Sequence, residues 1–185
     1  MSPAFARAGL VAIVGKVKNM KHIISALVQN KSGVLAHVAG MFAARAFNID
    51  SLAVGRTDDP TLSRMTIVVV GDDKVVEQVR KQLAKIIDVV KVQDFSGREV
   101  IARDLMLICV HIPPEKRPEI LALVEMFKAK VVDIGQKFVM VEVSGPEDTI
   151  EAFIEACRPY GIKNMVRTGT VAMGRFDRPG AVDNQ

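Results

Sequence analysis

The stretch Asn30-Lys31-Ser32-Gly33-Val34-Leu35 decides the fold, because it joins a strand pattern to a helix pattern. Apolar residues run through 22–28 before it, and apolar residues spaced three and four apart run through 34–47 after it. A polar turn with Ser and Gly at such a junction leaves the first amides of the helix without backbone partners, at the positive end of the helix dipole.

Two interpretations of this turn stay open from the residues alone. In one, Ser32 caps the helix and Gly33 only serves the turn, and spacing favours this interpretation because capped helix starts are common. In the other, the amides of Gly33, Val34 and Leu35 hold the carboxylate of a ligand. Asn30 both donates and accepts hydrogen bonds, so it suits a ligand ammonium or carboxylate, and Gly33 permits close approach.

Outward from the turn, the first block reads strand, helix, strand, strand, helix, strand. After a linker at 96–98 the same order repeats, which predicts an α+β protein with two ferredoxin-like βαββαβ domains, each an antiparallel sheet with its helices on one face. The predicted strands are 22–28, 49–56, 64–70 and 89–92, then 104–112, 131–134, 138–143 and 162–171. The predicted domains are 21–96 and 97–174, with an N-terminal extension at 1–20 and a tail at 175–185.

Residues 1–20 contain Arg7, Lys16 and Lys18 and no acidic residue. This composition allows a targeting peptide, but the apolar run is short and no small-residue cleavage site follows, so we favour an extension. The expected location is cytoplasmic, or organellar if the extension is a transit peptide.

The composition is that of a globular protein, with 185 residues, 49% hydrophobic residues, 25% charged residues and a net charge of +4. No apolar run approaches the roughly 20 residues that span a bilayer. Cys109 and Cys157 lie far apart in apolar patterns, which predicts two buried thiols.

The sequence contains none of the common catalytic or phosphate-binding motifs, so we expect a binding module and not an enzyme. Asp58 and Asp59 are adjacent carboxylates before Pro60, and we interpret them as turn formers within residues 57–61. Arg64 is a candidate ion-pair partner for either of them.

The βαββαβ plan also serves RNA-binding domains, which stack bases on aromatic residues of the central strands. The equivalent strands here, 22–28 and 64–70, carry no aromatic residue, so we expect no nucleic-acid partner. A rival hypothesis is a ligand- or metal-responsive transcription regulator of the same fold, with His22, His37 and His111 as candidate ligands. Their spacing is not typical of a metal site.

The turn, together with Phe47-Asn48-Ile49-Asp50-Ser51-Leu52, resembles the N-terminal ACT domain of the regulatory (small) subunit of acetohydroxyacid synthase, also called acetolactate synthase. The ten residues 57–66, Thr-Asp-Asp-Pro-Thr-Leu-Ser-Arg-Met-Thr, are closer still to that family. The resemblance runs from about residue 20 to residue 174 and includes, more weakly, residues 131–134 and 167–169.

The resemblance implies a non-catalytic regulatory subunit that forms a homodimer through the ACT domain and binds valine at the dimer interface. One chain would contribute Asn30, Lys31, Ser32, Gly33, Val34 and Leu35, and the other chain would contribute Asn48 and Ile49. The family's catalytic (large) subunit is a separate chain that carries thiamine diphosphate, magnesium and FAD, so no cofactor is expected here. The small subunit raises the activity of that chain and confers feedback inhibition by valine in branched-chain amino-acid biosynthesis.

The sequence departs from the family in its first 19 residues and at Lys31, a position that is often acidic in relatives. A cation beside a zwitterionic ligand changes its affinity or selectivity. The choice among valine, leucine and isoleucine therefore stays open, as do the oligomer number and the surface that meets the catalytic chain.

Overall fold

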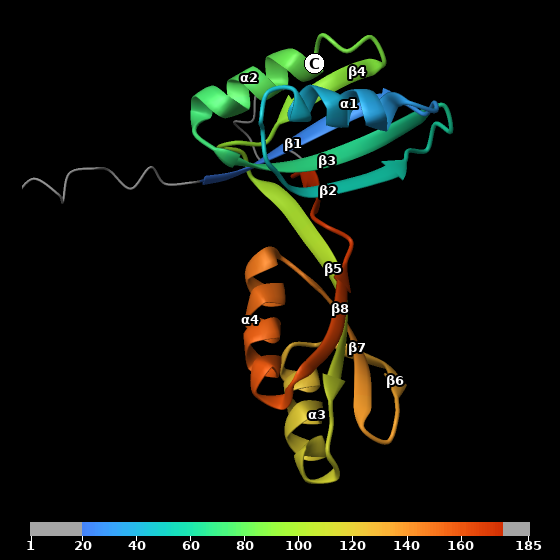
Figure 1. Ribbon diagram of the computed structural model, residues 1–185, viewed down its shortest axis with the longest axis vertical. Helices are drawn as coiled ribbons and strands as arrows, with labels where there is room; N and C mark the ends of the chain where they lie inside the picture. Colours follow the sequence, from blue (N-terminus) through green and yellow to red (C-terminus); the bar gives the residue numbers. More distant parts are fainter. Residues whose placement is uncertain (1–19, 176–185) are drawn as a thin grey trace, which may run out of the picture.

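The computed structural model describes residues 20–175, which form two βαββαβ units in sequence (Figure 1). Both sheets are antiparallel and share one strand order, β2-β3-β1-β4 in the first unit and β6-β7-β5-β8 in the second. The predicted α+β class with two ferredoxin-like units is confirmed. The predicted end segments lie outside the described residues, except that Met20 begins β1 and Arg175 follows the last strand.

The first unit begins with strand β1, leads through the turn at 30–33 into helix α1, and returns in β2. A hairpin joins β2 to β3, and helix α2 then carries the chain to β4. The bounds are β1 Met20–Gln29, α1 Val34–Ala43, β2 Ile49–Arg56, β3 Leu62–Gly71, α2 Asp73–Leu83 and β4 Val89–Asp94.

Alternation along β1 and β3 sets the core of the first unit. Every second residue faces the two helices and is buried, as Ile24, Ala26 and Ile67 are. Both helices contribute the matching side, with Phe42 from α1 and Val79 from α2 almost fully buried.

The second unit repeats this order with two short 3₁₀ turns added. Its bounds are β5 Val100–His111, η1 Pro114–Lys116, α3 Arg117–Met126, β6 Lys130–Ile134, β7 Phe138–Gly145, α4 Glu147–Cys157, η2 Arg158–Tyr160, β8 Ile162–Arg167 and β9 Val171–Gly174. Its core lies between the sheet and helices α3 and α4, where Phe153 packs edge-to-face on Phe127 with ring centroids 5.2 Å apart.

The prediction of a single last strand over 162–171 is wrong. The chain turns at 168–170, where Gly169 has φ +79°, and residues 171–174 form a separate strand, β9. Strand β5 also starts four residues earlier than predicted, because Val100–Arg103 pair with β9 before the rest of β5 enters the second sheet. β5 therefore runs from beneath the first unit into the second (Figure 1), and the domain limits of 21–96 and 97–174 stay a prediction.

Helix α1 ends at Ala43, four residues before the predicted end at Phe47. Ala46 takes a left-handed conformation at φ 54°, and the amide of Phe47 reaches back to the carbonyl of Phe42 at 3.1 Å. This is a Schellman motif, which closes a helix and lets the residue after it pack on the last turn. The ring of Phe47 accordingly packs on that of Phe42, with centroids 6.2 Å apart.

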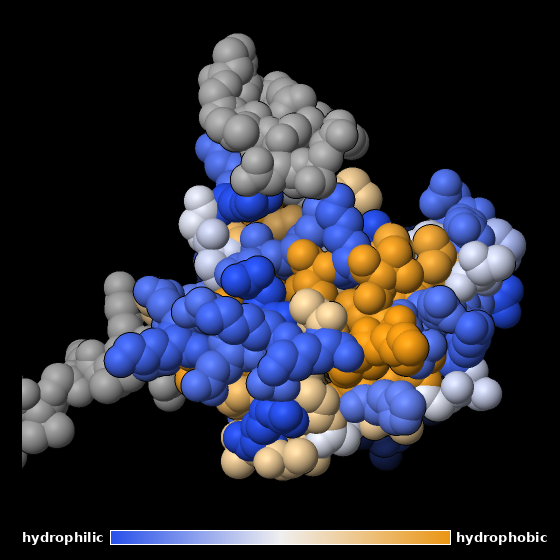
Figure 2. Space-filling view, turned by 90° about the horizontal axis from the view of Figure 1, so that it is seen from above, coloured by the Kyte–Doolittle hydropathy of each residue, from blue (hydrophilic) through white to orange (hydrophobic). Residues whose placement is uncertain are grey.

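The outer face of α1 is apolar and carries small side chains. Leu35 is 46% exposed, and Ala36, Ala39, Gly40 and Ala43 are exposed beside it. Figure 2 looks down on this side of the first unit and shows apolar residues gathered over part of it. Within residues 20–175, no helix is long and apolar enough to cross a membrane.

Burial raises the pKa of the Cys157 thiol to about 11. A raised thiol pKa means that the folded protein keeps the proton, so this contribution to stability is complete below the unfolded pKa near 8.5 and decreases as the pH rises above it. We expect the Cys109→Ser variant, in which Cys157 is the only thiol, to react with Ellman's reagent at pH 8 only on unfolding. Rapid reaction of the native variant would contradict the buried position of Cys157.

Candidate functional site

The turn between β1 and α1 ends on Gly33, which occupies the N-cap position with φ 86° and ψ −18°. The prediction that Ser32 caps the helix is wrong, because the left-handed glycine makes the cap and no side chain within residues 20–175 accepts from the first turn. The first helical backbone bond runs from the amide of His37 to the carbonyl of Gly33 at 2.9 Å. The amides of Val34, Leu35 and Ala36 before it are thus left to solvent or to a ligand.

The turn is held in place by the β2–β3 hairpin. The backbone amide of Asn30 donates to the carbonyl of Thr61 at 2.7 Å, and its side-chain Nδ2 donates to the carbonyl of Pro60 at 2.9 Å. The stretch 57–66 and the turn are therefore one structural feature, with the hairpin loop as the support of Asn30. The sequence gives no signal of this contact, because the two segments lie about thirty residues apart.

Of the two acidic residues in the hairpin, Asp59 stabilises the turn. Asp59 accepts from both the amide and the hydroxyl of Thr61, at 2.8 and 2.7 Å, in an Asx-type turn. The predicted ion pair of Arg64 with Asp58 or Asp59 is wrong. Arg64 lies on the helix-free side of β3 and donates to Ser25 Oγ at 3.1 Å, across the neighbouring strand β1.

Two residues at the junction of β1 and the turn, Gln29 and Asn30, carry side-chain acceptors. Because Nδ2 of Asn30 is already bonded to Pro60, its side-chain oxygen is the group left for a ligand. The side-chain oxygen of Gln29 is buried and has no hydrogen-bond partner among the described residues. The sequence analysis did not single out Gln29. The signal that could have identified it is a polar residue at the last position of an otherwise apolar strand.

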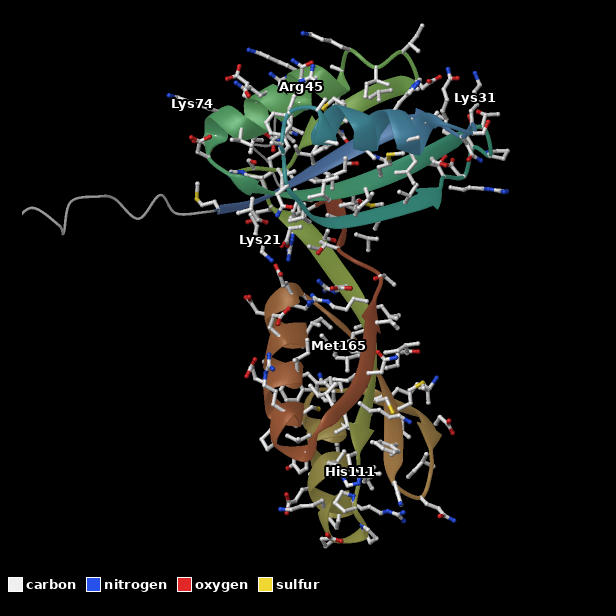
Figure 3. All side chains as sticks on the ribbon, in the orientation of Figure 1. Lys21, Lys31, Arg45, Lys74, His111 and Met165 are labelled. Atoms are coloured by element: carbon white, nitrogen blue, oxygen red, sulfur yellow. The ribbon has the colours of Figure 1, made fainter. Side chains whose placement is uncertain are left out.

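Open space surrounds the turn. A Cβ atom placed on Gly33 would meet no atom within 4 Å. Ser32 and Lys31 are exposed, and Lys31 makes no ion pair within the described part of the chain. In Figure 3, Lys31 marks this end of the first unit and Lys21 the opposite end. The turn alone is therefore an incomplete binding site that is open to solvent on one side.

Asn48 and Ile49, the other predicted site residues, lie at that opposite end of the sheet. Ile49 pairs with Val69, whereas Arg56, at the other end of β2, pairs with Ser63 beside the hairpin. The eight residues of β2 span roughly 25 Å at 3.3 Å per residue. One chain therefore does not bring its own turn and its own Asn48 together.

Strand β2 is an edge strand, with β3 on one side and no strand on the other among the described residues. An edge with unpaired amides and carbonyls is a template for another strand. If β2 pairs antiparallel with its copy in a second chain, Ile49 of one chain lies near Arg56 of the other, which is the end that carries the turn. Helix α1 crosses over β3 on its way from β1 to β2, so it lies over the β2 half of the sheet. Its exposed face is therefore near the β2 edge.

The three histidines do not form one site. His22 is buried between Ser96 and the carbonyl of Gly71, His37 lies 72% exposed at 4.0 Å from Asp88, and His111 packs on Phe138 in the second unit. No group of three or more potential metal ligands was found within residues 20–175. The rival hypothesis of a metal-responsive regulator has no supporting geometry.

Comparison with known proteins places both units in one family. Residues 24–91 match the family described as the AHAS small subunit-like ACT domain, and residues 103–176 match the family described as the small subunit of acetolactate synthase. The probable acetolactate synthase small subunit of Archaeoglobus fulgidus is 56% identical over 159 residues, which cover 86% of this chain and 99% of the relative. That of Bacillus subtilis is 44% identical over 167 residues, covering 90% of this chain and 97% of the relative.

A solved structure agrees with these matches. The crystal structure of the acetolactate synthase small subunit from Thermotoga maritima superimposes with a TM-score of 0.80 at 40% sequence identity. The superposition covers 86% of this chain and 99% of that one.

The hairpin predicts a specific titration. The hydroxyl and amide of Thr61 lower the pKa of Asp59, so the contribution of this carboxylate to folding is present above its unfolded pKa near 3.9 and is lost as the pH falls through the folded value. Thr61→Val removes the hydroxyl and keeps the amide. We expect carboxyl-carbon NMR titration to show the pKa of Asp59 below its ordinary value in the wild type and closer to it in the variant. Equal pKa values would contradict the role of Thr61.

Proposed function

The chain belongs to the family of acetolactate synthase small subunits, and we propose that it binds valine in a dimer and places a separate catalytic chain under feedback inhibition. Family membership makes it a regulatory subunit without an active site of its own. We also propose that the chain activates the catalytic chain, forms a homodimer and takes valine as its effector.

The observation that carries the proposal is the helix start at Gly33. Its amides have no side-chain cap, a ligand has room to approach, and the hairpin fixes the turn from behind. A carboxylate bound to the amides of Val34 and Leu35 would also gain from the helix dipole. The side-chain oxygen of Asn30 is an acceptor suited to the ammonium of the same amino acid.

A second chain completes the binding site. The β2 edge and the exposed apolar face of α1 would pair with a copy of this chain about a two-fold axis. Such pairing brings Asn48 and Ile49 of the partner to the open side of the turn. Leu35 and Ile49 would then line the space for the ligand side chain.

Selectivity among branched-chain amino acids is expected to be moderate. A buried methylene contributes about 0.8 kcal/mol, or roughly a fourfold change in affinity, so leucine and isoleucine would compete with valine unless the pocket is too small for them. Lys31 adds a positive charge at the rim of the binding site, where it attracts the ligand carboxylate.

The partner implied by the family is the catalytic (large) subunit, and we place thiamine diphosphate, magnesium and FAD on that chain. Valine would favour one packing of the dimer, and that packing would differ in its contact with the catalytic chain. Coupling of about 1–3 kcal/mol is enough for strong inhibition, and the catalytic chain must change valine affinity by the same factor. We assign the complex to the cytoplasm. The organellar alternative depends on residues that lie outside 20–175.

Substitution of Gly33 separates feedback from activation. Gly33→Asp puts a carboxylate beside the ligand carboxylate, and Asp and Asn both tolerate left-handed backbone better than most residues. In an assay of the purified catalytic subunit reconstituted with this chain, we expect Gly33→Asp to raise the valine concentration for half inhibition by about tenfold or more, equal to about 1.4 kcal/mol. Activation without valine should stay close to that of the wild type.

Gly33→Asn is the matched control, because it has the same shape without the charge and should respond to valine better than Gly33→Asp. Equal loss of activation and feedback in Gly33→Asp would show that the turn is structural only.

A further inference from the structure

The two units meet beside the start of β2. Ser51 Oγ, in β2, accepts a hydrogen bond from the backbone amide of Thr170 at 2.9 Å, across 119 residues of sequence. Gly169 packs directly against the same strand, since a Cβ atom there would lie 2.6 Å from Ser51 Oγ and 3.4 Å from the carbonyl oxygen of Leu52. The turn between β8 and β9 thus contacts the backbone of β2 with no room for a larger residue.

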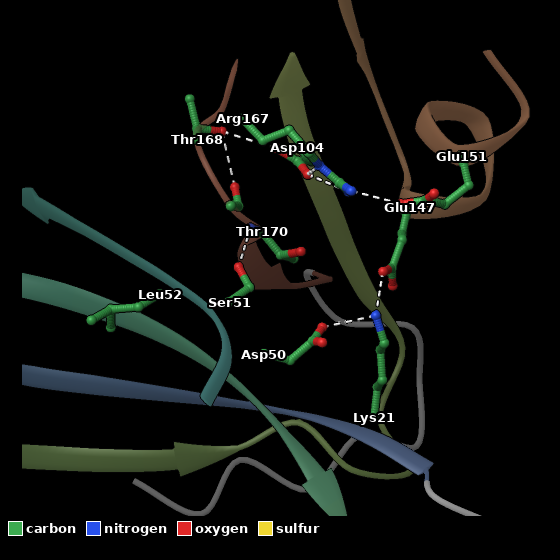
Figure 4. Close-up of a pocket in the computed structure, with 11 residues that line it drawn as sticks. Lys21, Asp50, Ser51, Leu52, Asp104, Glu147, Glu151, Arg167, Thr168 and Thr170 are labelled. Carbon is green, nitrogen blue, oxygen red and sulfur yellow. Dashed lines mark hydrogen bonds and ion pairs between the residues drawn. The ribbon is translucent and has the colours of Figure 1, made fainter. Parts of the chain in front are cut away.

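A second link joins the units through Lys21 (Figure 4). Its ammonium lies 2.8 Å from Asp50 Oδ2 in β2 and also pairs with Glu147 in the first turn of α4. These hydrogen bonds, that to Asp50 above all, raise the pKa of Lys21, so the bridge stays charged at neutral pH. One side chain of β1 therefore ties β2 to a helix of the second unit.

The turn between β8 and β9 is attached to the rest of the second unit by hydrogen bonds and ion pairs. Asp104, only 3% exposed, accepts from Arg167 Nε at 2.7 Å and from the hydroxyl of Thr168 at 3.2 Å. Arg167 also pairs with Glu151 of α4. Movement of residues 167–170 thus entails movement of the second unit.

A cleft of about 430 Å³ separates the units around these contacts. It is lined from both sides, by Lys21, Asp50 and Ser51 of the first unit and by Glu147 and Arg167 of the second. Ser51 of β2 contacts Gly169 and Thr170 of the second unit directly, and Asp50 is connected to Glu147 of the second unit through Lys21. Asp50 and Ser51 directly follow Asn48 and Ile49.

We propose that the contact of Asp50 and Ser51 with Lys21, Gly169 and Thr170 couples effector binding at the start of β2 to the position of the second unit. The inference rests on the proposed function, since it takes Asn48 and Ile49 as part of the effector site. A ligand that draws these two residues toward a partner's turn shifts the next two residues of the same strand. Because Gly169 packs closely on Ser51, a shift of Ser51 displaces residues 167–170 and, through them, the second unit.

The test compares two glycines with positive φ. Gly169→Ala forces a methyl group against Ser51, whereas Gly161→Ala also places a side chain at a positive φ, +92°, but has no atom nearer than 3.9 Å to its new Cβ. Lys21→Met is a second test variant that removes the bridge at a partly exposed position. Each full-length protein is studied for valine binding by calorimetry, for hydrogen exchange of residues 162–174 by mass spectrometry, and for valine inhibition when reconstituted with the catalytic subunit.

In the wild type and Gly161→Ala, we expect valine to change exchange in residues 167–174 about twofold or more. In Gly169→Ala and Lys21→Met, we expect valine to bind within about threefold of the wild-type affinity but with less than about half of the exchange response and of the maximal inhibition.

Two failures are distinguishable. If the wild type binds no valine, the proposed function falls, and this inference falls with it. If the wild type binds and responds while both test variants respond like Gly161→Ala, only the coupling is overturned. Should Gly169→Ala not fold, Lys21→Met decides on the same criterion.

Discussion

The unpaired edge of β2 is the constraint on which the rest of the structure depends. This strand has β3 on one side only within the described residues, so its other edge is free for a second chain. Its end leads into the hairpin that supports Asn30, and its start carries Asn48 and Ile49 followed by the contacts to the second unit. One strand therefore connects the turn, the free sheet edge and the second unit, and a ligand that moved this strand would act on all three.

Whether the turn only caps α1 or can bind a ligand depends on whether a side chain accepts hydrogen bonds from the first amides of the helix. With a serine cap, the amides of α1 would have been partly satisfied within the chain. With Gly33 in the left-handed conformation they are left free, and the chain keeps an anion-binding helix end. This arrangement is affordable because the turn is fixed from outside by Pro60 and Thr61.

Periodicity was enough to predict most of the fold, because alternation in strands such as 49–56 and stripes in helices such as α2 follow from burial on one face. It failed where backbone conformation or a distant contact decides. The early end of α1 depends on Ala46, an alanine in a conformation more typical of glycine. The break between β8 and β9 falls at Gly169, which has a positive φ, and Arg167 just before it bonds to Asp104, sixty-three residues away in sequence. The site residues came from family resemblance, whereas the opposite placement of the turn and Asn48 emerged only from the strand register.

The central claim, that the effector site is built from two chains, has a direct test in mixed dimers. A Gly33→Asp chain and an Asn48→Asp chain are co-expressed with different tags, and the heterodimer is purified and titrated with valine by calorimetry. Each homodimer has two damaged sites and should bind valine about tenfold or more weakly than the wild type. The heterodimer has one doubly damaged site and one intact site, so the account predicts one valine per dimer at close to wild-type affinity. A heterodimer that binds no better than either homodimer would contradict a shared site.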